Sequence, residues 1–448
     1  MIERLLTVAG RRADGGADAL WRRVERTSIA FESGRLKAAG TAEETGANLR
    51  VRHRGRVGVA GSTAAGDATD ELVTRALASA ELGEELEIVF PSAAPLPRVP
   101  TFFAAAADAP LDRLTAIGRS LLDRLARDGC QINVTIERET VETRVANTAG
   151  AAGEYRSTGI GVSAEVWRIA GDDVLAIGDA YEGADLPSDE ALAALVRSIS
   201  ARLEHALRIV APPEGALPVV FTPSGLSALL LPLTQALSGK AVLQGISPLA
   251  EKVGARVFDA RLSLSDDPLC AGRTPSRPMD DECVPSCVLP LVQQGVVERF
   301  IYDLETAARA HTASTGHGQR GIFGKPVPGY SNIVLDGGGR GKGRELGKPA
   351  GSAELGGGLL GAVRDGLLVD ELIGVGQGNV IGGAFSHPVA LAYRIERGVI
   401  VGRVKDAAIA GNAYELWKRV GGFGGDARWT GSRYAPSVLM EGISVARR

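Results

Sequence analysis

The pattern of apolar and polar positions predicts a chain that mixes helices with strands. Apolar residues recur every three or four positions from Leu111 to Leu125, which predicts an amphipathic helix over Leu111–Arg127. From Val389 to Ile395 apolar and polar residues alternate, as expected for a half-buried strand. Both periodicities recur along the chain, so neither an all-helical nor an all-strand fold fits.

In the first half of the chain, the same patterns and the residues typical of turns predict where helices and strands begin and end. The expected helices are Ile2–Gly10, Asp70–Leu82 and one that begins after Ser188, an N-cap residue followed by acidic residues. The expected strands are Thr27–Glu32, Ala47–His53, Val57–Ser62, Ile132–Arg138, Val141–Asn147, Gly159–Trp167 and Val174–Tyr181. A proline-punctuated linker, Pro91–Pro100, interrupts this half.

The second half is richer in strands and glycine. Hairpins are expected to turn at Gln293-Gln294-Gly295 and at Glu396-Arg397-Gly398, with a helix at Ala413–Arg419 and a final strand at Ser437–Ala446. We therefore predict a two-lobed α+β fold with mixed and antiparallel sheets and packed helices. The predicted domains are 1–210, with candidate sub-units 1–90 and 101–210, and a strand-rich domain 215–448.

The segment from Gly215 to Gly239 has no charged residue and is long enough to span a membrane. Three prolines, Pro218, Pro223 and Pro232, break it. A strand at Pro218–Thr222 and a buried helix from Ser224 explain it better, so we expect no membrane span.

Composition narrows the class of protein. The chain has 448 residues, is 45% hydrophobic and carries a formal net charge of −3 without a long run of one sign. Nucleic-acid binding needs clustered Lys and Arg, so no nucleic-acid partner is expected. Four cysteines in so long a chain do not make a disulfide scaffold. Charged residues interrupt the first apolar run, which argues against a signal peptide and favours a cytoplasmic location.

Several short motifs occur in a recognisable order. They are Asp280-Asp281-Glu282-Cys283, Ile301-Tyr302-Asp303-Leu304, Ser314 to Arg320, Ser331-Asn332-Ile333-Val334-Leu335, Gly366 to Gly378, and Ile409-Ala410-Gly411-Asn412. Together they resemble the TldD/PmbA family of peptidase subunits. The resemblance is close over roughly the last 230 residues and looser upstream, and it implies the same two-lobed α+β fold.

One motif of the metal-bearing members is missing. Those members carry HExxxH on a helix, where two His residues bind zinc and the Glu activates water, and a Cys near the C-terminus completes the ligand set. The matching positions here are Leu230, Leu231 and Gln235, and Ser432-Arg433-Tyr434 stands near the place of the Cys. The resemblance is therefore to the metal-free PmbA (TldE) type of subunit, with no cofactor in this chain and zinc in a TldD-like partner.

This resemblance implies a function. The chain would form a heterodimer with a zinc-bearing TldD-like subunit, or a homodimer when alone, and would help to enclose unfolded peptides or peptide precursors for the partner's zinc. No residue of this chain is expected to be catalytic. The expected peptide-binding residues are Ser314, Thr315, Gly316, His317, Arg320 and Asn332.

Alternatives of other classes stay open from sequence alone. A self-contained hydrolase could bind a metal through Asp280, Asp281 and Glu282 with His317. The family's description as modulators of DNA gyrase suggests a protein interaction instead. Three further features carry weak or no site signals. Cys283 and Cys287 near Cys270 form only a weak zinc signal, and the glycine runs Gly337–Gly343 and Gly374–Gly378 fit neither a P-loop nor a dinucleotide motif.

Overall fold

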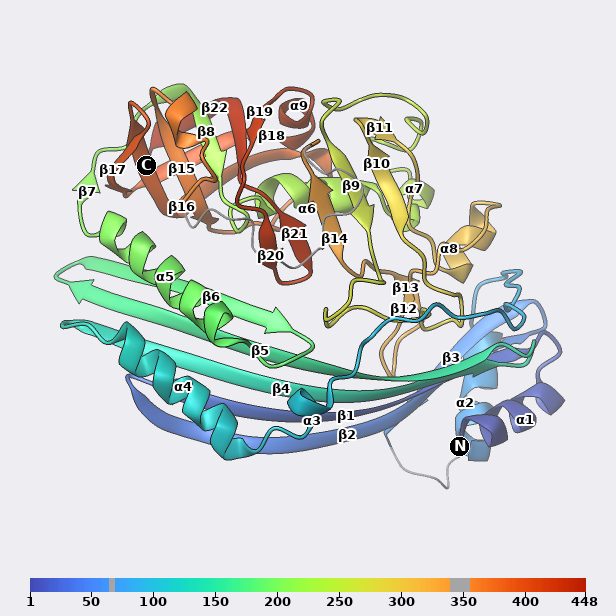
Figure 1. The fold of residues 1–448 in the computed structure, drawn as a ribbon. Coiled ribbons are helices and arrows are strands. Elements are labelled where there is room, and N and C mark those ends of the chain that lie inside the picture. Colours follow the sequence, from blue (N-terminus) through green and yellow to red (C-terminus); the bar gives the residue numbers. More distant parts are fainter. Residues whose placement is uncertain (64–68, 339–354) are drawn as a thin grey trace.

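A computed structural model describes residues 1–63, 69–338 and 355–448. Its base is a long antiparallel sheet in the order β3-β2-β1-β4-β5-β6 (Figure 1). The strands are β1 (Ala17–Glu32), β2 (Arg35–His53), β3 (Arg56–Ser62), β4 (Cys130–Asn147), β5 (Ala152–Ala170) and β6 (Asp173–Gly183). This one sheet takes strands from both sides of the 91–100 linker.

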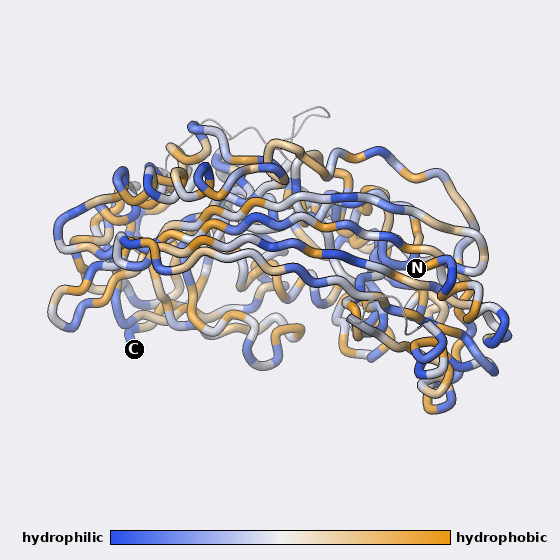
Figure 2. The backbone as a smooth tube through the Cα atoms, turned by 90° about the horizontal axis from the view of Figure 1, so that it is seen from below, coloured by the Kyte–Doolittle hydropathy of each residue, from blue (hydrophilic) through white to orange (hydrophobic). Residues whose placement is uncertain are grey.

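The strands of this sheet are longer than the sequence pattern predicted. The two strands expected at 132–138 and 141–147 are one continuous β4, which pairs with β1 on one side and β5 on the other. Polar residues in the middle of these strands hid their continuity. Seen from below, the middle of the long strands is largely hydrophilic (Figure 2). A central strand keeps its backbone paired whatever its side chains face.

Helices cover both ends of the sheet, as Figure 1 shows. Near the N-terminus α1 (Ile2–Arg12) and α2 (Thr69–Glu81) pack on β1 and β3, and toward the other end α4 (Leu111–Leu125) and α5 (Asp189–Ala206) pack on β4 and β6. A short α3 (Ala104–Ala107) precedes α4. The predicted helices are confirmed, including the Ser188 N-cap, whose hydroxyl accepts a hydrogen bond from the backbone N–H of Ala191 at 3.2 Å.

The C-terminal region contains a second large sheet, in the order β15-β8-β22-β18-β16-β17-β7. Because β15 also pairs with β16, five of its strands close into a ring. The strands are β7 (Ile209–Val210), β8 (Gly215–Phe221), β15 (Asp365–Leu372), β16 (Ala384–Glu396), β17 (Val399–Val404), β18 (Ala407–Asn412) and β22 (Val438–Arg447), with β19 (Val420–Phe423) beside β22. The predicted hairpin at 396–398 joins β16 to β17.

Smaller strands and helices complete this region. A third sheet has the order β11-β10-β9-β14-β21-β20, and β12 pairs with β13. These strands are β9 (Ser263–Asp266), β10 (Leu289–Gln293), β11 (Val296–Val297), β12 (Gly318–Gln319), β13 (Val327–Pro328), β14 (Ile333–Asp336), β20 (Arg428–Thr430) and β21 (Arg433–Ala435). The helices are α6 (Ser227–Ala236), α7 (Gly239–Leu243), α8 (Leu304–Arg309) and α9 (Ala413–Trp417), with 3-10 turns η1 (Leu360–Ala362) and η2 (Val380–Gly382).

The two regions share a hydrophobic core. One buried cluster joins Ile136 of β4 and Leu195 of α5 with Tyr393 of β16 and Leu439 of β22. Apolar burial across this contact stabilises the arrangement of the two regions as well as each region by itself. No helix among the described residues combines the length and apolar character needed to cross a bilayer. Residues 339–343 of the glycine run Gly337–Gly343 lie outside the described residues.

Candidate functional site

The acidic turn that opens the recognised motifs is buried. The Asp280 carboxylate accepts hydrogen bonds from the backbone N–H groups of Glu282, Val284 and Gly318, each at 2.9 Å. Cys283 adopts a positive φ of 65° within this turn. Asp280 therefore holds the turn against β12 and does not face solvent. Its carboxylate accepts the hydrogen bonds that these buried backbone N–H groups would otherwise make to water.

Glu282 enters an ion network that joins the two regions. Arg50 of β2 donates to Glu282 Oε1 and to Asp18 Oδ2 of β1, each at 2.6 Å. Arg320 donates to the same Asp18 carboxylate at 3.0 Å and to Asn48 Oδ1 at 3.1 Å. The Arg50 side chain is 1% exposed. Such buried charges are tolerated only because each is paired and hydrogen bonded.

Other predicted peptide-binding residues are also engaged inside the protein. His317 is 1% exposed, and its Nε2 lies 3.2 Å from Asp266 Oδ2 while Nδ1 lies 2.9 Å from Thr315 Oγ1. Asn332 donates through Nδ2 to the carbonyl oxygen of Asp267 and to Ser276. Neither residue faces a solvated loop. Their role toward a peptide stays a prediction, and the structure places them as supports of neighbouring segments.

The polar loop before His317 is shaped by its own side chains. The hydroxyls of Ser314 and Thr315 donate to the carbonyl oxygen of Tyr302 at 3.2 and 3.1 Å. Gly316 has a positive φ of 74°, and an added Cβ would lie 3.1 Å from the carbonyl oxygen of Pro285. This conformation suits glycine, since other residues rarely adopt it. Ser314 and Thr315 are half-buried, so contact with a peptide remains a prediction for them as well.

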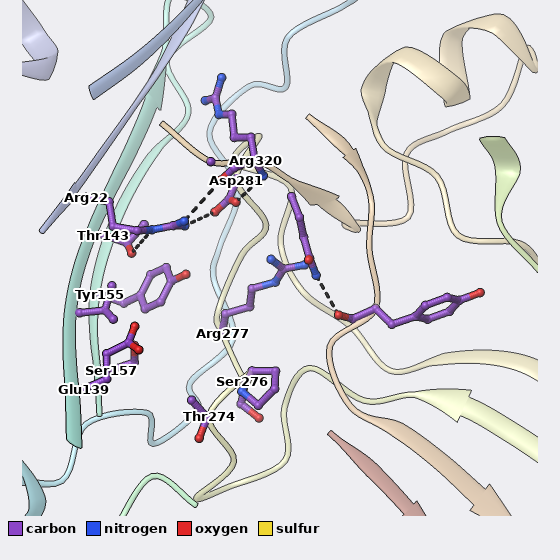
Figure 3. Close-up of a pocket in the computed structure, with 15 residues that line it drawn as sticks. Arg22, Glu139, Thr143, Tyr155, Ser157, Thr274, Ser276, Arg277, Asp281 and Arg320 are labelled. Carbon is purple, nitrogen blue, oxygen red and sulfur yellow. Dashed lines mark hydrogen bonds and ion pairs between the residues drawn. The ribbon is translucent and has the colours of Figure 1, made fainter. Parts of the chain in front are cut away.

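A pocket of about 480 Å³ lies beside this network. Figure 3 shows Thr143, Tyr155 and Ser157 of β4 and β5 on one side, facing Thr274 and Arg277 across the cavity. Sequence reasoning missed this pocket because its walls come from segments far apart in the chain. Only Arg320 among the predicted binding residues lines it, and its guanidinium leaves the pocket for Asp18.

At the Arg22 side of the pocket the charges are paired. Arg22 donates to Asp281 Oδ1 at 2.9 Å and to the carbonyl oxygen of Arg320 at 3.3 Å. The second Asp281 oxygen accepts the backbone N–H of Arg320 at 2.9 Å. Glu139, which also lines the pocket, pairs with Arg26 at 2.9 Å. The carboxylates of the pocket are therefore neutralised by neighbouring groups.

The family resemblance expects the zinc motif at 230–235, which lies on α6. Leu230 is buried in the core, Leu231 is half-buried beside a small pocket of about 100 Å³, and Gln235 is exposed. Pro232 lies inside the helix, and its carbonyl oxygen accepts a hydrogen bond from the Tyr414 hydroxyl at 3.1 Å. Leucine side chains have no lone pair for a metal, so these residues do not fit a zinc ion.

A cationic residue from the segment that resembles the place of the family's Cys lies near this helix. Arg433 of β21 donates to the hydroxyl of Ser227, the first residue of α6, at 2.9 Å. Burial lowers the pKa of Arg433 from its ordinary value, although a guanidinium keeps its charge at neutral pH. A positive charge here opposes a divalent cation, which adds to the misfit of α6 itself.

The alternative metal site of the sequence analysis also lacks a suitable arrangement. Asp280, Glu282 and His317 each have the internal partners described above. Across residues 1–63, 69–338 and 355–448, no group of three or more His, Cys, Asp or Glu side chains is placed to hold a metal ion. The cysteines are free, with Cys270 and Cys283 buried and Cys287 exposed. Burial raises the pKa of the Cys283 thiol to about 12, so it is a poor nucleophile.

The buried carboxyls predict a pH dependence of stability. Burial raises the pKa of Glu282 to about 8 against the opposing Arg50 charge, and raises that of Asp280 to about 6. Their ordinary values are 4.5 and 3.8, so between these and the raised values the folded chain holds protons that the unfolded chain releases. The free energy of unfolding should then fall as pH rises from about 5 to about 8. Urea unfolding across this range measures it.

Glu282→Gln should remove most of that slope, whereas Glu43→Gln, at an exposed pair with Arg23, should leave it unchanged. A wild-type chain that is equally stable, or more stable, at pH 8 than at pH 5 would contradict the raised pKa values.

Comparison with known proteins agrees with this geometry. A family model described as the PmbA/TldA metallopeptidase C-terminal domain matches residues 214–447, and one described as PmbA/TldA metallopeptidase domain 1 matches residues 17–80. The metalloprotease TldD homolog of Haemophilus influenzae is 27% identical over 217 residues, covering 48% of this chain and 42% of that protein. A metalloprotease of Methanothermobacter thermautotrophicus is 27% identical over 248 residues, covering 55% and 51%. The chain thus spans about half the length of the curated relatives it matches.

Solved structures extend the likeness to the whole fold. TldE from Thermococcus kodakarensis superposes with a TM-score of 0.87 at 23% identity, covering 99% of both chains. A protein of Thermotoga maritima, described as a candidate modulator of a DNA gyrase, gives 0.85 at 21% identity and again 99% of both. At such identities these likenesses establish the fold alone.

Proposed function

The chain belongs to the PmbA/TldD metallopeptidase family, and we propose that it is the subunit of a TldD/TldE-type complex that holds no zinc of its own. The observation that supports this proposal is α6, which carries Leu230, Leu231 and Gln235 where the family resemblance expects two zinc ligands and a base. The likeness of the whole fold to a TldE supports it. A zinc-bearing TldD-like chain would supply the metal and the activated water, and both chains would act in the cytoplasm.

An unpaired strand edge gives the complex a place for an extended chain. β2 pairs with β1 along its length but with β3 only from Ala47 onward. Among the described residues, no strand pairs with the other edge of β2 before Ala47, and positions 35–44 are all exposed. Main-chain hydrogen bonding at such an edge binds extended segments of many sequences. We propose that this edge pairs with an unfolded peptide. A folded protein would be excluded, because it has no free extended segment to pair with the edge.

The prediction is that peptidase activity depends on association. The chain alone, treated with a chelator and dialysed, should contain less than about 0.1 zinc per chain and should cleave unfolded, dye-labelled casein at no more than about one hundredth of the rate of the mixed complex, since it has no group that activates water. Zinc analysis and the casein assay, run on the chain, on a TldD-like chain of the same family and on the mixture, measure this.

A matched control changes the partner's motif Glu to Gln, which should abolish cleavage while the complex still forms. Cleavage by the metal-stripped chain alone at the rate of the mixture would reject the proposal and favour a self-contained hydrolase.

A further inference from the structure

The pocket beside the ion network contains a buried guanidinium that is not fully hydrogen bonded. Arg277 is 7% exposed and lines the cavity. Its Nε and Nη2 atoms are buried and form no hydrogen bond with any described residue. Figure 3 shows the side chain extending into the pocket from the 274–277 segment. Burying an unpaired cation is costly, so its position calls for a negatively charged partner from outside the chain.

The neighbouring carboxylates do not fill this role. Asp281 is bound by Arg22 and by the backbone of Arg320, and Glu139 by Arg26. The Arg277 charge lowers the pKa of Asp280 against the effect of burial, but the Asp280 oxygens accept their hydrogen bonds from three backbone N–H groups and none from Arg277. Two nitrogens of the Arg277 guanidinium thus have no hydrogen-bond partner, and the sign of this charge selects an anion.

The rest of the lining suits an organic anion. Ser157, Thr274 and Tyr155 line the cavity and supply hydroxyl groups and an aromatic ring. About 480 Å³ lies within the usual range of small-ligand pockets, about 300–1,000 Å³. Hydroxyl groups can donate hydrogen bonds to a carboxylate, and an aromatic ring can contact the apolar or peptide part of the molecule that carries it. A planar guanidinium binds a carboxylate through two parallel hydrogen bonds.

We propose that this pocket binds a carboxylate of a peptide, with Arg277 as its ionic partner. The source of the carboxylate is either the free C-terminus or an acidic side chain, which share this chemistry. The assignment to a peptide rests on the proposed function, whereas the anion site rests on Arg277 alone. Such a site would anchor one end of a substrate within the same chain that offers an open strand edge.

The test measures binding to the isolated full-length chain, which separates it from the peptidase assay. The probe is a short dye-labelled Ala-Leu-Ala peptide, followed by fluorescence anisotropy, in three forms: free acid, C-terminal amide, and amide with one Glu. The free acid should bind at least about tenfold more tightly than the amide, because a charge-assisted bidentate contact is lost. Tight binding of the Glu-containing amide also supports the site and assigns it to any carboxylate. Equal binding of all three would overturn the proposal.

Two variants separate binding from folding. Arg277→Met should weaken binding of the free acid by about ten- to hundredfold and leave the melting temperature unchanged or higher, because it removes an unpaired buried charge. Arg156→Gln is the control, since Arg156 is one residue from Tyr155 but exposed and stacked on Phe102. Unchanged binding in Arg277→Met, a fall in its melting temperature, or displacement of the free acid by micromolar inorganic phosphate would reject a peptide carboxylate site.

Discussion

Replacing Arg50 with methionine should lower the free energy of unfolding by about 3–5 kcal/mol. Arg50 is the cation shared by Asp18 and Glu282, and it is fully buried with both. Its loss leaves Asp18 with Arg320 as its cation and leaves the Glu282 carboxyl without its partner, in a site that water does not reach. Methionine fills a similar volume, so the loss reflects charge and not a cavity. Urea unfolding at pH 7 measures the change.

Arg23→Met on β1 is the matched control, because Arg23 pairs with Glu43 at 2.8 Å where both side chains are about half exposed. It should change the free energy of unfolding by less than about 1 kcal/mol. Adding Glu282→Gln to Arg50→Met should recover part of the lost stability, since the acidic group that lost its cation is then gone while Asp18 keeps Arg320. A single Arg50→Met variant as stable as wild type would show that the network is energetically neutral.

Replacing Arg202 with methionine should also lower the free energy of unfolding by about 3–5 kcal/mol. Arg202 lies on α5 and is buried between Asp370 of β15, at 2.8 Å, and Asp179 of β6, at 3.1 Å. Asp370 would keep only the hydroxyl of Thr222, at 2.7 Å, as a partner. This cluster joins the long sheet to the closed ring at the opposite end from Arg50, and chemical unfolding monitored by tryptophan fluorescence measures its contribution.

Helix α5 also offers a control for Arg202→Met. Arg197 is exposed and pairs with Glu190 at 2.6 Å, so Arg197→Met should cost less than about 1 kcal/mol. If Arg202→Met and Arg197→Met were equally mild, the Arg202 cluster would be excluded as a link between the two regions.

Local patterns predicted much of the fold because they depend on neighbours in sequence. The helices at 2–12, 69–81 and 111–125, the hairpins at 293–295 and 396–398, and the α+β class are confirmed. Strand length was underestimated where charged residues interrupt the alternation. β1 was expected from Thr27 but begins at Ala17, since Arg22 faces a pocket and Arg23 faces solvent while the backbone stays paired on both sides.

The candidate site could be predicted only in part, because most of its contacts join residues far apart in sequence. The lack of zinc donors at Leu230 and Leu231 is visible in the sequence, because a motif is local. The partners of Glu282 and His317, by contrast, are Arg50 and Asp266, and nothing near either residue in sequence predicts those contacts. Arg277 carries no sequence signal at all. A buried charge without a partner is defined by three-dimensional surroundings, so only the structure reveals it.

The closed ring also bears on how the chain is made. β8 lies between β15, to which it is parallel, and β22, to which it is antiparallel. At about 5–20 residues per second, a ribosome would deliver β22 roughly 10–40 s after β8. Until then Val219, Val220 and Phe221, all buried in the finished ring, have no permanent neighbours. The nascent chain should therefore depend on holding chaperones during this interval, and slower growth at low temperature should improve its soluble yield.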